Sequence, residues 1–261
     1  MADDSAAVRF TELGPAGSPI ESLDDPRMAD FYAYPDDPQT CWVRANMIAS
    51  LDGGATDDGK AGGLAGPGDR AVFALMRQQA DVILVGAGTV RVENYSGAQF
   101  SPAQRQARQR RGQAEVPPIA VVTNRGEFDH DAKLFTRTEV PPLILTSSRA
   151  AAATRSRLGS LGEVIDASGP RASEVDPATV LKILADRRLF RVLTEGGPSF
   201  LGSLISDGLL DELCLTIAPL LVGGSALRVS TGLDHVHSQM RCSHLLSDDA
   251  GYLYTRYVRG G

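Results

Sequence analysis

The sequence predicts an α/β domain with a mainly parallel central sheet and an antiparallel hairpin at its C-terminal end. Short continuous apolar runs, typical of strands buried on both faces, alternate along the chain with helical patterns. After the last helical pattern, two extended segments are joined by the polar turn 247–250 instead. No linker or internal repeat divides the chain, so we expect residues 41–261 to form one domain behind an N-terminal arm, residues 1–40.

Each expected element has its own signal in the sequence. The first 40 residues are rich in Asp, Pro and Ala and show no sustained period, which favours a loosely held arm with one short helix near residues 28–32. A strand is expected at 41–48, then a mobile glycine-rich loop at 52–66 and a helix at 69–79. Further strands are expected at 81–86, 119–123, 143–146, 163–165, 191–194 and 212–218, helices at 149–158, 177–187 and 199–207, and the hairpin strands at 237–246 and 251–259.

The composition excludes several classes of protein. Of the 261 residues, 43% are hydrophobic and no apolar run is long enough to cross a membrane, so full disorder and a transmembrane protein are excluded. The net charge of −6 makes general binding to nucleic acid unfavourable. Three widely spaced cysteines indicate neither a disulfide framework nor a metal site. With no secretory signal at the start, we expect reduced thiols and a cytoplasmic protein.

Three polar or glycine-rich loops follow the ends of expected parallel strands, at 50–53, 86–91 and 194–199. The middle loop departs from a dinucleotide-binding fingerprint because Arg91 stands where a third glycine belongs. The third loop places two glycines before a helix, where free N–H groups and the helix dipole favour an anion. The alternative is a tight turn with Glu195 in solvent. Because carboxyl ends of parallel strands share one edge, a ligand site is expected there.

Five blocks in fixed order carry a resemblance to a known family. They are ANMIASLDGGAT (45–56), GPGDRAVFALMRQQADVILVGAGTVRVEN (66–94), PPIAVVTNRG (117–126), RVLTEGGPSF (191–200) and DELCLTIAPLLVGG (211–224). The chain thereby resembles the pyrimidine reductase domain of riboflavin biosynthesis, which shares the dihydrofolate reductase fold. The resemblance implies a three-layer sandwich of that type, NADPH as cofactor, and hydride transfer to a C=N bond or an opened ribose imine of 5-amino-6-(5-phosphoribosylamino)uracil. The arm is too short for the deaminase domain that precedes the reductase in bifunctional members.

The resemblance also implies roles for individual residues. Glu93 and Glu195 are expected to orient the substrate or relay a proton, and Arg77, Asn46 and Asp52 to bind the substrate. The expected cofactor-binding residues are Ala49, Gly86, Thr89, Val90, Asn124, Arg125, Gly196, Gly197, Pro198, Ser199, Phe200 and Leu201. The role of Arg125, binding a 2′-phosphate, is inferred from its charge rather than from the family. The loop 52–66 is a candidate lid.

Departures from the family leave the substrate open. Asn46 replaces a usual lysine, and residues 94–100 replace a segment that ends in the arginine holding the substrate phosphate. Arg77 or one arginine of the 105–111 cluster would then bind that phosphate. The alternatives are a dihydrofolate or pterin reductase, a nucleotide-binding paralogue without activity, and an RNA-binding module using the same cluster. We expect that cluster instead to form a solvated helix face.

The expected partner is a second copy of the chain. The strand at 212–218 and the C-terminal hairpin are apolar and would form an uncovered edge of the sheet. We therefore expect a two-fold homodimer through this edge.

Overall fold

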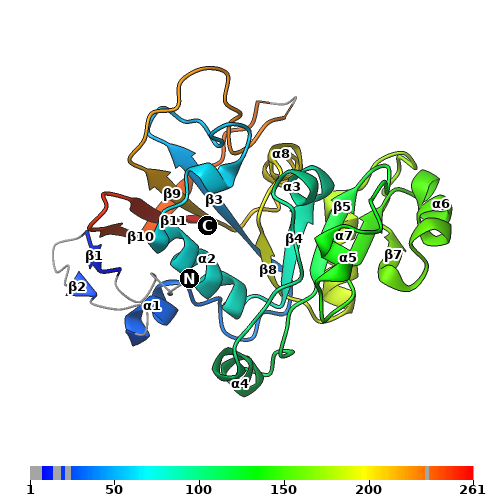
Figure 1. Cartoon of the computed structure of the whole chain (residues 1–261), viewed down its shortest axis with the longest axis horizontal. Coiled ribbons are helices and arrows are strands. Elements are labelled where there is room, and N and C mark those ends of the chain that lie inside the picture. Colours follow the sequence, from blue (N-terminus) through cyan, green and yellow to red (C-terminus); the bar gives the residue numbers. More distant parts are fainter. Residues whose placement is uncertain (1–7, 14–18, 21–24, 233–234, 261) are drawn as a thin grey trace.

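The computed structural model describes residues 8–13, 19–20, 25–232 and 235–260. Its described strands form one 11-stranded sheet in the order β2-β1-β10-β11-β9-β3-β8-β4-β5-β6-β7 (Figure 1). The parallel strands are β9 (Glu212–Ala218), β3 (Trp42–Ser50), β8 (Arg191–Thr194), β4 (Val82–Gly86), β5 (Ile119–Thr123), β6 (Leu143–Thr146) and β7 (Glu163–Asp166). The antiparallel strands are β11 (Leu253–Arg259), β10 (Met240–Asp248), β1 (Phe10–Glu12) and β2 (Pro19–Ile20).

Helices cover both faces of the sheet. Successive side chains of a strand point to opposite sides, so a continuously apolar strand presents apolar side chains on both faces. In β4, Val82 and Leu84 pack toward one face, and Ile83 and Val85 toward the other. The first face is covered by α7 (Pro177–Asp186) and α8 (Pro198–Ser206), and the second by α2 (Pro67–Gln79), α3 (Ala87–Val92), α5 (Lys133–Thr136) and α6 (Ser148–Leu158). The predicted fold class, three layers around a mostly parallel sheet with an antiparallel C-terminal hairpin, is confirmed.

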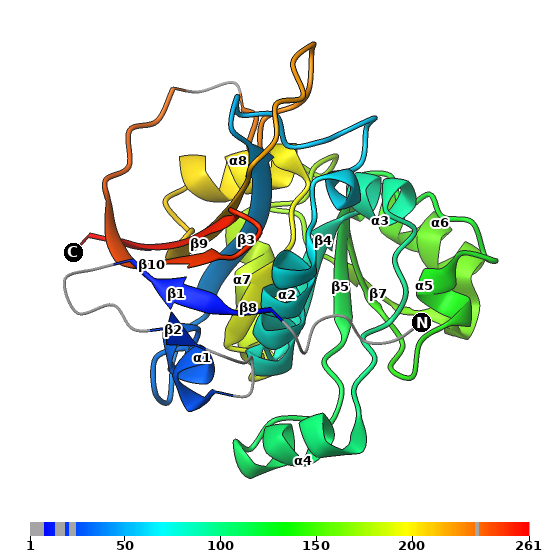
Figure 2. The ribbon, with the colours of Figure 1, turned by 60° about the vertical axis from the view of Figure 1, so that its left-hand side comes forward.

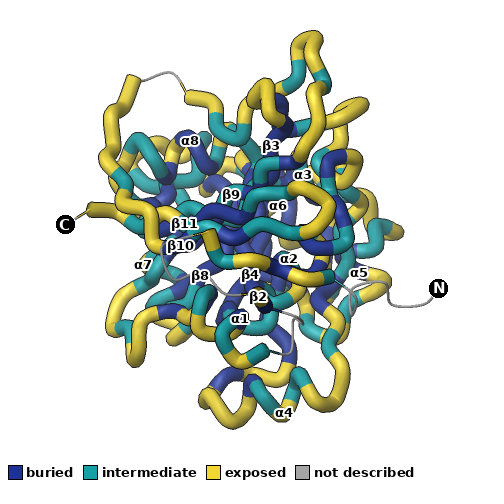
Figure 3. The backbone as a smooth tube through the Cα atoms, turned by 90° about the vertical axis from the view of Figure 1, so that its left-hand side faces the viewer, coloured by how far each residue is buried: buried dark blue, intermediate teal, exposed yellow. Residues whose placement is uncertain are grey.

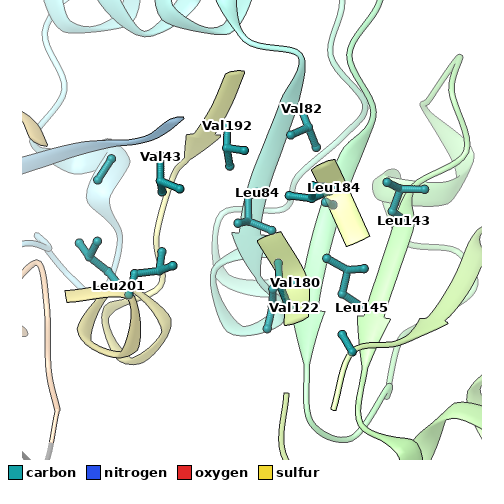
Figure 4. Close-up of a cluster of buried hydrophobic side chains, with 14 of the residues drawn as sticks. Val43, Val82, Leu84, Val122, Leu143, Leu145, Val180, Leu184, Val192 and Leu201 are labelled. Atoms are coloured by element: carbon teal, nitrogen blue, oxygen red, sulfur yellow. The ribbon is translucent and has the colours of Figure 1, made fainter. Parts of the chain in front are cut away.

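The core on the α7–α8 side consists of branched aliphatic side chains (Figure 4). Val43 and Leu84 of the sheet meet Val180, Leu184 and Leu201 of the two helices, and all five are fully buried. Figure 3 shows burial along the described residues: the central strands are buried, and α4 (Pro102–Arg110) is mostly exposed.

The described part of the N-terminal arm differs from the loosely held segment that we expected. β1 pairs with β10, and Phe10 and Ile20 are fully buried against the hairpin. The last turn of α1 (Pro26–Phe31) is also fixed, because Arg44 donates to the carbonyl of Tyr32 at 2.7 Å. The expectation that the C-terminal hairpin leaves a bare sheet edge is therefore wrong, since β1 covers β10.

The 105–111 arginine cluster is only partly the solvated helix face that we expected, because Arg110 and Arg111 are exposed but Arg105 and Arg108 are not. Arg108 on α4 is fully buried and donates to the carbonyls of Gln78 and Ala80 at 2.9 and 2.7 Å, at the end of α2. Arg105 pairs with Glu139 at 2.6 Å. Figure 2 shows α4 set apart below the sheet, on the side opposite the strand ends that carry the glycine-rich loops.

Candidate functional site

The carboxyl ends of β3, β4 and β8 enclose two adjoining cavities. The first, called here the groove, has a volume of about 670 Å³ and runs along the loops that begin α3 and α8. The second, the side pocket, has a volume of about 380 Å³ and lies against α2 and residues 94–96. Both cavities are lined by Met47, Ala55, Ala61, Thr89, Glu93 and Glu195. A molecule in the groove would therefore meet a molecule in the side pocket.

Two helix N-termini converge on the groove. Gly86 precedes α3 and Gly197 precedes α8, and neither provides a side chain to cap the first turn. The loops are joined directly, because the Gly86 N–H donates to the Gly196 carbonyl at 2.8 Å. Uncapped N–H groups and positive dipole ends make this part of the groove suited to a phosphate or pyrophosphate.

The two glycines of the third loop are needed for different reasons. Gly196 has φ +94°, a conformation that other residues rarely adopt, and its peptide bond to Gly197 is cis. Gly197 has φ −49°, which any residue can adopt. A Cβ at Gly197 would instead lie 3.0 Å from the Thr89 hydroxyl, inside the groove. The sequence alone did not show that Gly196 is needed for its backbone conformation and Gly197 for the space beside Thr89.

The far end of the groove is polar and carries a cation. Asn124 accepts a hydrogen bond from the Val175 N–H at 2.9 Å, so its amide also fixes the neighbouring loop. Arg125 is exposed, and its guanidinium forms no ion pair or hydrogen bond with the described residues. This end of the groove can therefore attract a second anionic group.

One face of α2 forms a wall of the side pocket, where Asp69, Phe73 and Arg77 follow one another at four-residue intervals. Arg77 binds Glu195 through two bonds of 2.6 and 2.7 Å, and the Tyr95 hydroxyl donates to the same carboxylate at 2.7 Å. Burial raises the pKa of Tyr95, and the Glu195 carboxylate raises it further. For Arg77, burial lowers the pKa, but the carboxylate more than compensates, so that its pKa lies above the ordinary value.

These contacts bear on the expected roles of Arg77 and Glu195. A carboxylate accepts about four hydrogen bonds, and Glu195 already receives three. Glu195 is therefore better placed to fix Arg77 and Tyr95 than to relay a proton. Arg77 is correspondingly not a free cation for a substrate phosphate.

Glu93 lies where the two cavities meet. Its carboxylate accepts from the Ala61 N–H at 2.7 Å, which ties the glycine-rich loop to the end of α3. Its other oxygen faces Gly62, where a Cβ would lie 3.6 Å away. Glu93 is thus the partly exposed carboxylate at the junction, with acceptor capacity left for a ligand.

Most of the residues expected from the sequence line these cavities. Those in the groove are Gly86, Thr89, Asn124, Arg125 and Gly196 to Phe200, and those in the side pocket include Asn46 and Arg77. Glu93 and Glu195 line both.

Four expected residues lie elsewhere. Val90 and Leu201 are buried in the hydrophobic clusters, and Ala49 is buried and lines neither cavity. Asp52 lines neither cavity, because its carboxylate accepts from Ser50 Oγ at 2.5 Å and from the Gly223 N–H at 2.7 Å. These bonds lower the pKa of Asp52 to about 2. Through them, the Asp52 carboxylate holds the 222–223 loop in place.

Residues of the side pocket that the sequence did not identify include Asp69, Arg70, Phe73 and Tyr95. The four-residue spacing from Arg77 back along the expected helix could have identified Asp69 and Phe73. No comparable signal marked Tyr95, because it lies in the segment that departs from the family.

Two structural findings concern other classes of function. Among the residues that the structure describes, no group of three or more His, Cys, Asp and Glu could hold a metal ion. No helix in the described ranges is both long and apolar enough to cross a bilayer.

Comparisons with known proteins agree on one family. A 2,5-diamino-6-ribosylamino-4(3H)-pyrimidinone 5′-phosphate reductase of Archaeoglobus fulgidus is 27% identical over 184 residues, covering 70% of this chain and 82% of the relative. The riboflavin biosynthesis protein RibD of Bacillus amyloliquefaciens is 30% identical over 186 residues, and the match spans 70% of this chain but only 47% of that protein.

Comparison with solved structures also finds a pyrimidine reductase-like protein. A pyrimidine reductase-like protein of Corynebacterium diphtheriae superposes with a TM-score of 0.79 at 27% identity, covering 89% of this chain and 99% of that one. The family model of the RibD C-terminal domain matches residues 41–254, which include both cavities and most of the sheet. The chain belongs to the RibD C-terminal domain family.

Proposed function

We propose that this protein is an NADPH-dependent reductase of a phosphorylated ribosylaminopyrimidine. One observation carries the proposal: a groove built for a phosphate-rich ligand shares six lining residues with a pocket of the size of a small ring compound. When bound, the cofactor supplies the hydride. The chain supplies alignment, because the six shared residues fix where the two molecules touch.

The groove residues fit a dinucleotide. The uncapped starts of α3 and α8 offer N–H donors to a pyrophosphate, and Gly86 and Gly197 keep side chains out of its way. Arg125 at the polar end fits the extra 2′-phosphate that distinguishes NADPH from NADH. We therefore propose NADPH rather than NADH.

The substrate phosphate needs a cation, and neither candidate expected from the sequence is both free and at the site. Arg77 is bound to Glu195, and no arginine of the 105–111 cluster lines the groove or the side pocket. Arg70 also lines the side pocket, is exposed, and uses one nitrogen to bond the Ala65 carbonyl at 2.9 Å. We assign the phosphate to Arg70, with Asn46 and Glu93 contacting the rest of the substrate.

Oxidation of NADPH tests the proposal. The purified protein is offered the phosphorylated ribosylaminopyrimidine, its dephosphorylated form and dihydrofolate. We expect turnover of the phosphorylated pyrimidine, and Arg70→Gln should raise its KM by about 10- to 100-fold without changing NADPH affinity. Arg110→Gln, on the exposed side of α4, is the matched control.

Other outcomes identify the alternatives. Turnover of dihydrofolate alone would establish a pterin reductase. Tight NADPH binding without turnover of any compound would indicate a nucleotide-binding paralogue. Equal turnover of the phosphorylated and dephosphorylated pyrimidines would reject the phosphate role of Arg70.

We also propose a homodimer in the cytoplasm. The edge expected to pair is covered by β1, but one face of the antiparallel strands presents the partly exposed apolar side chains of Leu215, Ile217 and Leu253, with Tyr257 beside them. These residues lie opposite the face that packs on α1 and α2. The free thiols of Cys41, Cys214 and Cys242 support a reducing compartment.

A further inference from the structure

We propose that Leu227 contacts the reacting end of the bound cofactor and shields it from water, and that Asp52 is the positioning residue that holds Leu227 there. The inference rests on the proposed function and adds to the groove a contact that the family resemblance did not imply. Leu227 is carried by residues 219–231, which follow β9 and are called here the strap. In Figure 2 the strap is the orange loop at the top of the molecule.

Leu227 is an apolar side chain that the core of the described residues does not use. It is 55% exposed and belongs to none of their buried hydrophobic clusters, whether as a buried member or as a partly buried neighbour. It does line the groove, together with the loops that begin α3 and α8, but not the side pocket. A ligand that covers Leu227 is therefore the molecule in the groove, and covering an exposed leucine favours its binding.

The main chain fixes which end of the groove Leu227 faces. Its carbonyl accepts a hydrogen bond from the Ala55 N–H at 2.7 Å. Ala55 is one of the six residues that line both cavities, so Leu227 lies beside the junction, whereas Arg125 marks the far end of the groove. Hydride passes where the two molecules touch, so the ring that reacts belongs at the junction. Leu227 would therefore meet the nicotinamide end of the cofactor and not its 2′-phosphate.

The strap is anchored at two places. At the end of β3, Asp52 accepts from the N–H groups of Val222 and Gly223 at 3.2 and 2.7 Å. At the start of α8, the Thr231 N–H donates to the Pro198 carbonyl at 3.0 Å. Leu227 lies between these two anchors in the sequence, so its position over the groove depends on both.

Asp52 acts on the strap and not on a ligand. Its carboxylate lines neither cavity, and it also accepts from Ser50 Oγ at 2.5 Å, which fixes it at the end of β3. Loss of the carboxylate would leave two strap N–H groups without their acceptor, shortly before Leu227 in the sequence. Any effect of Asp52 on the cofactor would then pass through the strap.

An apolar contact at the junction suits hydride transfer. N–H groups and cations bind the phosphates of a dinucleotide, but its reduced nicotinamide ring is uncharged. Excluding water from the reacting centre strengthens the electrostatic interactions around it and prevents side reactions. A leucine removes water from this point without offering the ring a competing hydrogen bond.

Fluorescence of bound NADPH tests the shield, because its titration gives the affinity and its quenching by acrylamide gives the exposure of the nicotinamide. In Leu227→Ala, we expect acrylamide to quench bound NADPH more strongly than in the parent. The Kd for NADPH should rise about 10-fold, because less apolar surface is buried. Leu221→Ala is the matched control and should match the parent in both measurements, since Leu221 is on the same strap, is 76% exposed and lines neither cavity.

A double-mutant cycle tests the link between Asp52 and Leu227. Asp52→Ala should raise the Kd and the quenching as Leu227→Ala does, and its addition to Leu227→Ala should change the Kd by less than about twofold. Asp52→Asn keeps an acceptor for the Gly223 N–H and should restore most of the parent affinity. Effects that multiply in the double variant would reject the positioning role of Asp52.

The outcomes separate this inference from the proposed reaction. If bound NADPH is shielded in the parent and exposed in Leu227→Ala but no pyrimidine is reduced, the proposed reaction is wrong and the role of Leu227 stands. If the pyrimidine is reduced but Leu227→Ala keeps the parent Kd and the parent quenching, the role of Leu227 is rejected and the proposed reaction stands.

Discussion

At the scale of single residues, the site depends on its glycines as much as on its charged side chains. Gly196 provides an unusual backbone conformation, and Gly86 and Gly197 leave space where two helices begin. Some charged side chains of the site are paired with other protein groups, and others can still bind a ligand. Glu195 is occupied by Arg77 and Tyr95, whereas Glu93 keeps acceptor capacity.

Substitution of Gly197 tests the groove. In Gly197→Val, the Cβ would lie 3.0 Å from the Thr89 hydroxyl, and its methyl groups would fill the space between the two helix starts. Because φ is −49° there, the backbone itself tolerates valine. We expect NADPH affinity to fall by at least about 100-fold with little loss of stability, measured by fluorescence titration and thermal unfolding.

A glycine outside the groove provides the comparison. At Gly260 an added Cβ meets no atom closer than 3.8 Å, so Gly260→Val should bind NADPH normally. Unchanged NADPH binding in Gly197→Val would mean that the cofactor does not lie in the groove.

At the scale of elements, α2 connects the site with the rest of the fold. One of its faces lines the side pocket, and another packs Val72 and Met76 against the N-terminal arm. Its C-terminal end is held by α4, an element that contributes no residue to either cavity. The position of the side pocket therefore depends on a segment that looks like a polar insertion in the sequence.

Removal of the Arg108 side chain tests this support. Arg108→Ala leaves the carbonyls of Gln78, Ala80 and Ala114 without their donor. Loss of these bonds should lower the free energy of unfolding by about 2–4 kcal/mol in urea denaturation. Arg110→Ala, two residues along the same helix and exposed, should change it by less than about 0.5 kcal/mol. Equal effects of the two substitutions would show that α4 does not stabilise α2 in this way.

At the scale of the whole molecule, the described part of the N-terminal arm completes the antiparallel side of the sheet. Arg44, Glu212 and Arg256 form a buried ion cluster, and both arginines donate to carbonyls at the end of α1. His244 of β10 lies beside this cluster and packs on the rings of Phe31 and Tyr32. The arm is therefore held by polar and aromatic contacts that no local sequence pattern encodes.

His244 should make stability depend on pH. Burial and the charges of Arg256 and Arg44 lower its pKa from 6.5 to about 4, while Glu212 opposes them. Between these values the unfolded chain binds a proton that the folded chain does not, so folding stability falls as the pH drops from 6.5 toward 4. At about 1.4 kcal/mol per pH unit, the loss approaches about 3 kcal/mol.

The matched variant is His244→Phe, which keeps the ring contacts and cannot titrate. We expect its free energy of unfolding to vary less between pH 7 and pH 4.5 than that of the parent, measured by denaturation at each pH. The same pH dependence in both proteins would assign the effect to other groups.

The proposed dimer is also a property of the whole molecule. Light scattering at micromolar concentration should give twice the monomer mass. Leu253→Glu should give a monomer, because it places a charge on the apolar face of β9 and β11. Leu13→Glu, at a residue 44% exposed on the arm, should leave the mass unchanged. A monomeric parent would reject the dimer.

The sequence by itself determined the strands of the parallel core, the helices α2, α6, α7 and α8, and the three loops at one sheet edge, but it did not predict α3 or α5. β5 and β6 begin and end where their apolar runs do, because strands buried on both faces must be continuously apolar. β8 and β9 also have the expected bounds. The glycines of the β4 and β8 loops mark the two strand ends at which the groove lies.

Only the tertiary structure decided which charges are free. Arg77 and Glu195 are 118 residues apart in the sequence and paired in space, whereas Asp52 is used to hold a loop and Arg108 to hold a helix end. The pairing of β1 with β10 is similarly long-range. A local sequence pattern shows which residues are apolar and with what period they recur. The role of a charged side chain depends instead on the partners that distant segments of the chain bring next to it.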